Sequence, residues 1–238
     1  MLTTLQATDP GSRLAIGAVA AGVTQMPPKA DVLGSLKPLA AIVRFDRDEE
    51  IVAQGGKAAY CYLVVSGCVR TVRLSEDGRR QVGEFVFPGE LFGWEALDAH
   101  DFGAEAVTPV TLHRFARLDF DGLADRDHGF ARRLRELTGI QVRAGRDRMF
   151  RLGRMSACER VASFLLEMTE RMNLVDRPSI ELPMCRTDMA DYLGLTIETV
   201  CRELTQLRRD GTIAVERTKV TILDRRALAA AGCRRVIH

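Results

Sequence analysis

The sequence lacks any apolar run long enough to cross a membrane. A spanning helix needs about 20 predominantly apolar residues, and every such stretch of this 238-residue chain is interrupted by charges. The N-terminus, MLTTLQATDPGSR, also lacks the basic start and apolar centre of a secretory signal peptide. These absences argue against a membrane protein and predict a cytoplasmic location with no membrane partner.

Close pairs of cysteines are also missing. No CxxC occurs, and residues 1–60 contain no cysteine. Zinc and iron–sulfur sites usually take clustered thiolates, and disulfide frameworks suit smaller secreted chains. The sequence therefore predicts no metal and no cofactor, and mostly reduced thiols. The six cysteines are Cys61, Cys68, Cys158, Cys185, Cys201 and Cys233.

The chain has almost no net charge. Its formal value is +2, so any surface that binds nucleic acid must be local. The hydrophobic share of 46% and the charged share of 28% are those of an ordinary globular protein.

Short apolar runs separated by turn residues fill the segment from Ala40 to Phe115. This pattern predicts seven or eight strands. Ser75-Glu76-Asp77-Gly78 is typical of the turn in a tight hairpin. Recurrent glycines suit the corners of a small barrel or roll. We expect a β-roll over residues 39–129, preceded by a mobile tail over residues 1–38.

A helical period replaces the strand pattern over residues 130–155. A narrow apolar stripe on a long helix favours packing against one partner helix, as in a two-stranded coiled coil. We therefore expect a homodimer. Packing of the helix on its own barrel is the alternative. The predicted interface residues are Leu134, Leu137, Ile140, Ala144 and Leu152.

The last segment, residues 156–238, predicts a winged helix-turn-helix. Ser156 and Glu159 fit a capping box that starts one helix. A second helix is stopped at Gly194, and Thr196 is a good N-cap for a third. TIAVERTKVTIL then alternates as two short strands, the wing. The fold class is thus α+β.

One polar face of the third helix is unsuited to a core. If Val200, Leu204 and Leu207 are buried, the opposite face points outward from the helix N-terminus, which in this motif enters the DNA major groove. Arg202 can donate two hydrogen bonds to guanine, and Glu198 can accept one from cytosine. Ile197 or Cys201 could touch a thymine methyl group. An ordinary surface ion pair is the alternative interpretation.

Phosphate contacts are expected from hydroxyl and basic side chains beside this helix, which predicts double-stranded DNA as a partner. The candidates are Thr196, Thr199, Thr205, Arg186, Arg208, Arg209, Arg217 and Lys219.

The chain from about Ala40 to Leu228 resembles the superfamily of the cAMP receptor protein and the fumarate–nitrate reductase regulator. VVSGCVRTVRLSEDGRRQVGEFVFPGELFG resembles its β-roll, and RMSACERVASFLL resembles the end of its dimer helix and the helix that follows. CRTDMADYLGLTIETVCRELTQLRRDG is similar to the helix-turn-helix of its FixK and FNR-like branch.

This resemblance implies a homodimer on a palindrome of TTGAT-like half-sites that activates transcription through RNA polymerase. It also implies control of low-oxygen, microaerobic or nitrogen-related genes. The branch reads DNA with a Glu-x-x-Ser-Arg constellation, which maps onto Glu198, Cys201 and Arg202. Cys201 departs from the usual serine, which puts that contact in doubt.

The β-roll departs from relatives that bind cyclic nucleotides. FGWEALDAHDFGAEAV offers Trp94 where the ribose-binding Glu is expected and no Arg for the phosphate. Without that guanidinium a buried phosphate would stay unpaired. The four histidines are dispersed, which disfavours haem.

Cys185 remains a candidate for redox control. It precedes Arg186 and occupies an N-cap position, and both features favour the reactive thiolate. Oxidation there would add bulk or negative charge near DNA. A passive, poor cap is the alternative, and Cys201 is the second candidate thiol.

Two other functions stay open. The β-roll could bind an unidentified small molecule that gates a regulator of the same fold. A cupin-like enzyme needs several metal-binding histidines inside the roll, but only His100 and His113 lie in the strand region. We therefore predict a transcription regulator with no enzymatic activity.

Overall fold

The computed structural model describes residues 39–172, 174 and 179–232. The predicted tail, residues 1–38, and the last six residues of the predicted DNA-binding domain lie outside the described residues. In this part of the chain, no helix combines the length and apolar character needed to cross a membrane.

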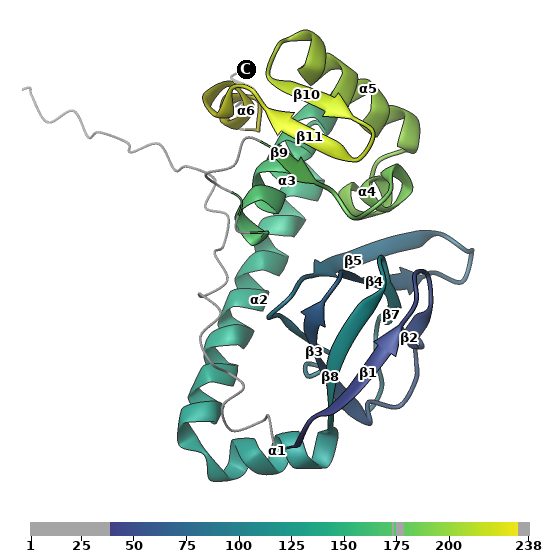
Figure 1. Cartoon of the computed structure of the whole chain (residues 1–238), viewed down its shortest axis with the longest axis vertical. Helices are drawn as coiled ribbons and strands as arrows, with labels where there is room; N and C mark the ends of the chain where they lie inside the picture. The colour runs from purple at the N-terminus through teal and green to yellow at the C-terminus, as the bar shows by residue number, and fades with distance from the viewer. Residues whose placement is uncertain (1–38, 173, 175–178, 233–238) are drawn as a thin grey trace, which may run out of the picture.

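Eight strands build the N-terminal domain (Figure 1). They pair antiparallel in two four-stranded sheets, ordered β1-β8-β3-β6 and β2-β7-β4-β5. The strands are β1 (Ala41–Phe45), β2 (Glu50–Val52), β3 (Tyr60–Ser66), β4 (Val69–Leu74), β5 (Arg80–Val86), β6 (Leu91–Phe92), β7 (Gly103–Ala106) and β8 (Val110–Ala116).

One apolar core joins the two sheets. Tyr62 and Leu112 come from the first sheet, and Val69 and Ala106 come from the second. The turn between β4 and β5 is the predicted hairpin, and Gly78 adopts φ 81° there. The predicted β-roll is therefore confirmed.

Two helices follow the roll. Helix α1 (Arg117–Arg126) was not predicted, because Phe120 is its one fully buried residue and the large apolar side chain of Leu118 lies in solvent, so no clear helical stripe marks it. Helix α2 (His128–Arg154) starts two residues earlier than expected, because the Asp127 carboxylate accepts hydrogen bonds from the backbone N–H groups of Gly129 and Phe130. It runs the length of the roll (Figure 1).

Helix α3 (Ala157–Arg171) begins at the predicted capping box. Glu159 accepts a hydrogen bond from the Ser156 backbone N–H at 2.7 Å, and Ser156 Oγ accepts one from the Glu159 N–H at 3.4 Å. Two backbone N–H groups at the N-terminus of the helix thereby have hydrogen-bond acceptors.

The remaining elements form the predicted winged helix-turn-helix. Strand β9 and helix α6 were not predicted, and β9 extends the two-stranded wing to a sheet ordered β10-β11-β9. The elements are β9 (Ser179–Glu181), α4 (Arg186–Leu193), α5 (Ile197–Arg209), β10 (Ile213–Glu216), β11 (Lys219–Ile222) and α6 (Arg225–Gly232).

The roll and the helix-turn-helix share an apolar core. Phe85 of β5 lies against Tyr192 of α4, with ring centroids 5.3 Å apart, and Phe164 of α3 lies 5.5 Å from Tyr192. Because all three side chains are buried, the two parts of the chain are packed against each other, not merely linked by α2.

The turn between α4 and α5 depends on Gly194. Its φ of 62° is a left-handed conformation, and an added Cβ would lie 3.1 Å from Leu152 Cδ2. We expect Gly194→Ala to lower the free energy of unfolding by about 1–2 kcal/mol. Gly122→Ala is the matched control, since Gly122 lies inside α1 with room for a methyl group, and it should raise stability by roughly 0.5–1 kcal/mol. Denaturant titration followed by circular dichroism measures both, and equal effects of one sign would contradict this account.

Candidate nucleic-acid interface

Helix α5 is fixed by one buried face. Val200, Leu204 and Leu207 are all buried against the rest of the C-terminal domain. Thr196 caps the helix, because its hydroxyl accepts a hydrogen bond from the Thr199 backbone N–H at 3.3 Å. The start of the helix and the face that it buries are therefore both determined by the sequence.

The opposite face of α5 lies in solvent. Ile197 is 41% exposed, and Glu198 and Cys201 are exposed beside it. The Arg202 side chain is 67% exposed, with its guanidinium 3.1 Å from the Glu203 carboxylate. The Glu203 side chain is 15% exposed, so this is a half-buried pair whose arginine remains open to solvent. The two groups predicted to read bases are thus both available at the surface.

Threonine hydroxyl groups form local hydrogen bonds along α5. Hydrogen bonds from the Glu198 backbone N–H and from Thr196 hold the pKa of Glu198 below its usual range. The Thr205 hydroxyl donates to the Cys201 carbonyl at 2.8 Å. Glu198 therefore presents a carboxylate, an acceptor for a base amino group, at neutral pH.

Basic residues lie on both sides of α5. Arg208, Arg209, Arg217 and Lys219 are exposed, at the end of the helix and at the tip of the wing. Arg186 has a different environment: its guanidinium donates to the Arg217 carbonyl at 3.0 Å and contacts Met189 Sδ at 3.1 Å. Arg186 thus ties α4 to the wing, in addition to its predicted role at the phosphates.

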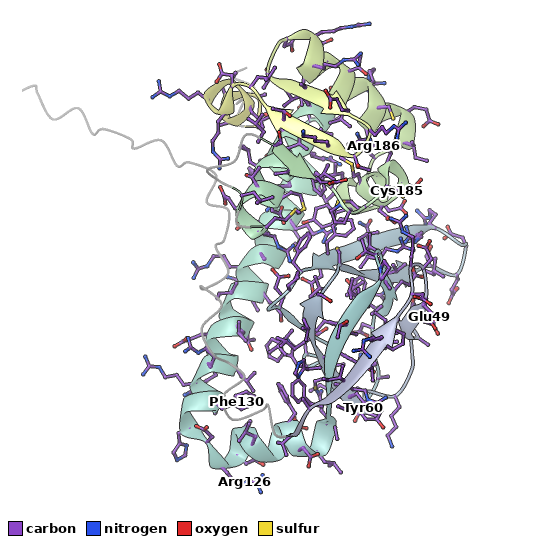
Figure 2. All side chains as sticks on the ribbon, viewed as in Figure 1. Glu49, Tyr60, Arg126, Phe130, Cys185 and Arg186 are labelled. Atoms are coloured by element: carbon purple, nitrogen blue, oxygen red, sulfur yellow. The ribbon has the colours of Figure 1, made fainter. Side chains whose placement is uncertain are left out.

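Cys185 is the N-cap of α4, as predicted. Its sulfur accepts a hydrogen bond from the Asp188 backbone N–H at 3.5 Å, and the residue is exposed (Figure 2). Sulfur is a weak acceptor, so this is a weak cap of α4.

Family comparisons agree with this architecture. Residues 42–127 match the family described as "Cyclic nucleotide-binding domain" and residues 159–231 match "Crp-like helix-turn-helix domain". The nitrogen fixation regulation protein FixK of Bradyrhizobium diazoefficiens is 40% identical over 194 residues, 79% of this chain and 82% of that protein. The chain belongs to the CRP/FNR superfamily, in its FixK/FNR-like branch.

Two further relatives support the same placement. FixK of Rhizobium meliloti is 41% identical over 177 residues, 73% of this chain and 78% of that protein. The solved structure of FixK2 from Bradyrhizobium japonicum is 38% identical with a TM-score of 0.78, over 83% of this chain and 99% of that chain. This FixK-like chain is therefore a transcription regulator that binds DNA through its helix-turn-helix.

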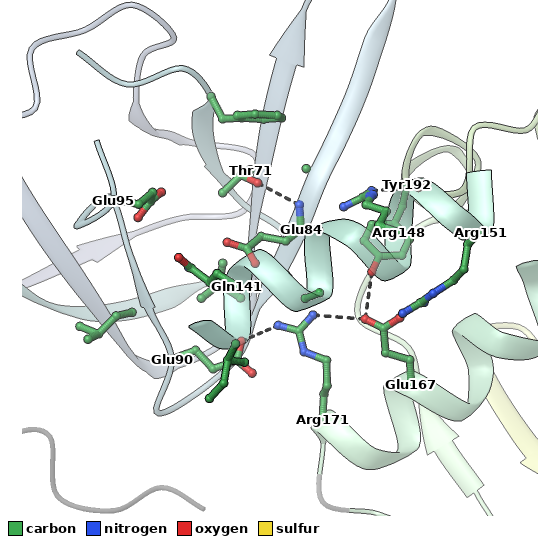
Figure 3. Close-up of a pocket in the computed structure, with 17 residues that line it drawn as sticks. Thr71, Glu84, Glu90, Glu95, Gln141, Arg148, Arg151, Glu167, Arg171 and Tyr192 are labelled. Atoms are coloured by element: carbon green, nitrogen blue, oxygen red, sulfur yellow. Dashed lines mark hydrogen bonds and ion pairs between the residues drawn. The ribbon is translucent and has the colours of Figure 1, made fainter. Parts of the chain in front are cut away.

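A cavity of about 340 Å³ lies between the roll, α2 and the DNA-binding domain (Figure 3). Three arginines line it, and each already has partners. Arg171 pairs with Glu90 at 2.7 Å, Arg151 pairs with Glu167 at 2.5 Å, and Arg148 donates to the Tyr192 carbonyl at 2.9 Å.

Two other carboxyl groups line the same cavity. Within the described part of the chain, Glu84 and Glu95 have no side-chain hydrogen bond or ion pair. An incoming phosphate would meet these carboxyl groups, and the one lining guanidinium without a carboxylate partner among the described residues, that of Arg148, already donates to the Val82 and Tyr192 carbonyls. The cavity therefore does not fit a cyclic nucleotide. Among the described residues there is also no group of three side chains placed to bind a metal.

The predicted stripe on α2 faces its own chain more than expected. Leu134 and Leu137 are half-buried against the aromatic cluster around Phe120, while Ile140 and Ala144 line the cavity. Leu152 is half-buried near Gly194. The large exposed apolar side chains of α2 are Val142, Met149 and Phe150.

Sequence reasoning missed Glu84. The β5 sequence does not mark this residue as functional, because the groups around it come from α2, α3 and the loops on either side of β6. Burial raises the pKa of Glu84 to about 7, with Glu90 and Glu95 acting in the same direction and Arg171 and Arg148 opposing.

The raised pKa makes the stability of the chain depend on Glu84. The folded state binds the Glu84 proton more tightly than the unfolded state does. The contribution of this proton to the free energy of unfolding is therefore complete at pH values below the ordinary pKa of a glutamate, and it is lost as the pH rises through 7. We expect Glu84→Gln to be more stable than wild type at pH 8 by about 1–2 kcal/mol, with a smaller difference at pH 5. Denaturant titration at both pH values tests this. Glu76→Gln, on the exposed hairpin, is the control, and an equal change in both variants would contradict the account.

Proposed function

We propose that this chain is a homodimeric transcription activator that binds a palindrome of TTGAT-like half-sites and contacts RNA polymerase. Its target genes serve low-oxygen, microaerobic or nitrogen metabolism. The FixK relatives carry nitrogen fixation regulation in their names, which supports this choice of genes.

The exposed face of α5 carries the proposal. Glu198 and Arg202 lie one turn apart near the N-terminal end of a helix whose other face is buried. The N-terminal residues of a recognition helix reach base edges, where arginine pairs with guanine and a carboxylate accepts from cytosine. Cys201 and Ile197 complete this surface as apolar neighbours. Thr196, Thr199, Thr205 and the flanking basic residues are proposed to hold the phosphates.

The dimer is proposed to form along α2. Val142 and Met149 are one heptad apart and exposed, and Thr138, Gly145 and Leu152 continue the same face at alternating four- and three-residue spacings. Two copies packed on this face would bury the side chains that a single copy leaves in solvent. Of the residues predicted from sequence, Leu134 and Leu152 adjoin this face, while Leu137, Ile140 and Ala144 turn toward the roll.

Ligand gating is the second candidate, and the cavity favours it. Glu84 and Glu95 line it without a side-chain hydrogen bond or ion pair among the described residues, so a ligand there would carry hydrogen-bond donors or positive charge toward these two carboxyl groups instead of phosphate. Mass spectrometry of the purified protein under native conditions tests this candidate by detecting a bound small molecule.

Arg202 and Arg208 should affect DNA binding differently. Arg202→Ala should weaken binding to the palindrome by about 1–3 kcal/mol per half-site and remove discrimination at one base pair, because a bidentate base contact is lost. Arg208→Ala should weaken binding to all sequences alike and reduce the salt dependence by about one counterion per protomer. Fluorescence anisotropy with single-base variants of the site, at several salt concentrations, separates the two effects. Uniform loss across sequences for Arg202→Ala would refute base reading by this residue.

Peroxide should weaken DNA binding by the wild-type protein if Cys185 is a redox switch. Oxidation replaces the capping sulfur of α4 with a larger, polar or charged group. Cys185→Ser should bind DNA equally well before and after peroxide, since a serine hydroxyl also caps a helix. Gel-shift assays with and without peroxide measure this, with Cys201→Ser as the matched variant. Protection by Cys201→Ser and not by Cys185→Ser would move the switch to α5.

A further inference from the structure

Strand β5 is an edge strand that the DNA-binding half of the chain covers. Among the described strands it pairs with β4 alone, at the end of its sheet. The Val82 carbonyl accepts a hydrogen bond from Arg148 at 2.7 Å, and the Phe85 carbonyl accepts one from Arg171 at 2.6 Å. Groups that an edge strand would otherwise leave unpaired are thereby satisfied by α2 and α3. Helix α4 lies against the same strand (Figure 1).

Two arginines of the roll bind the first helix of the helix-turn-helix. Arg80 of β5 lies 2.6 Å from the Asp191 carboxylate and 3.0 Å from that of Asp188. Arg70 of β4 lies 3.1 Å from Asp188. Glu105 of β7 contacts both arginines, at 2.8 Å from Arg70 and 3.5 Å from Arg80. We call these five residues the interdomain ion-pair cluster.

The centre of the cluster is shielded from water, while Arg80, Asp191 and Glu105 around it are 24%, 21% and 31% exposed. The Asp188 side chain is 3% exposed and that of Arg70 is 12% exposed. A shielded pair of this kind adds little net stability compared with apolar packing, but loss of one partner leaves a buried charge uncompensated. The cluster chiefly restricts how the two domains are oriented, since these ion pairs can form in few relative positions of the roll and the helix-turn-helix.

Orientation of α4 determines orientation of α5. Asp188 and Asp191 are three residues apart and share one face of α4. The eight-residue helix then leads through Gly194 directly into α5, against which it packs. A rotation of α4 on the roll would therefore carry the recognition helix with it.

We propose that Arg70 and Arg80 are positioning residues for DNA recognition, which hold each helix-turn-helix at the angle where both recognition helices of a dimer reach their half-sites together. This inference rests on the proposed palindrome and dimer. Two half-sites lie about 34–36 Å apart on one face of DNA, so a wrongly oriented domain can still bind one half-site but not both.

Charge reversal tests the proposal on the full-length protein. Arg80→Glu and Asp191→Arg are made singly and together, and binding is measured to the full palindrome and to the same DNA with one half-site scrambled. Each single variant should bind the full palindrome roughly tenfold more weakly and the single half-site within about twofold of wild type. The double variant, whose net charge equals that of wild type, should recover most of the lost full-site affinity.

Arg79→Glu is the matched control, because Arg79 is the neighbouring residue and is 83% exposed. Within the residues that the structure describes, its one ion pair is with Asp77 of the same hairpin. It should bind both DNAs like wild type. Arg80→Gln removes the charge with less perturbation, and thermal melts of every variant confirm folding.

Three results would overturn the proposal: wild-type affinity of Arg80→Glu and Arg80→Gln for the palindrome, equal losses on full and half-sites, or no recovery in the double variant. Failure of wild type itself to prefer the palindrome would instead refute the proposed function on which the inference rests.

Discussion

Burial of one face of α5 is the constraint on which the functional surface depends. Val200, Leu204 and Leu207 are buried in one apolar core, so their packing sets the rotation of the helix about its axis. Glu198 and Arg202 then lie outward, and only local contacts hold them: Thr196 hydrogen-bonds Glu198, and Arg202 pairs with the neighbouring Glu203. The surface proposed to read bases is thus a consequence of core packing, because the buried face of α5 decides which side chains point outward.

The position of α5 relative to the rest of the molecule has a second origin. The aromatic contact of Phe85 with Tyr192 supplies burial between the roll and the helix-turn-helix, while the ion pairs of Arg70 and Arg80 with Asp188 supply direction. Apolar contacts have no preferred direction, whereas charged hydrogen bonds are directional. In the proposal made above, the roll thereby has a structural role in DNA recognition that needs no ligand in its cavity.

Local signals in the sequence predicted most of this fold. The capping box at Ser156, the cap at Thr196 and the turn at Gly194 each involve residues within four positions of one another, so their pattern is visible in one dimension. The α1 helix was missed because its surroundings, not its periodicity, bury Phe120. Arg70 and Asp188 are separated by 118 residues, and only the folded chain brings them together. The environment of Glu84 and the exposed face of α2 were not predicted either, because both depend on contacts between segments that are distant in the sequence.

The central claim is that two copies of α5 read base edges in inverted half-sites. Selection of bound DNA from a random pool tests it most directly, because no sequence is assumed beforehand. The account predicts recovery of an inverted repeat whose half-sites are centred about one helical turn apart, each with an invariant G·C pair. Recovery of sequences without two-fold symmetry, or enrichment by A·T content alone, would contradict it.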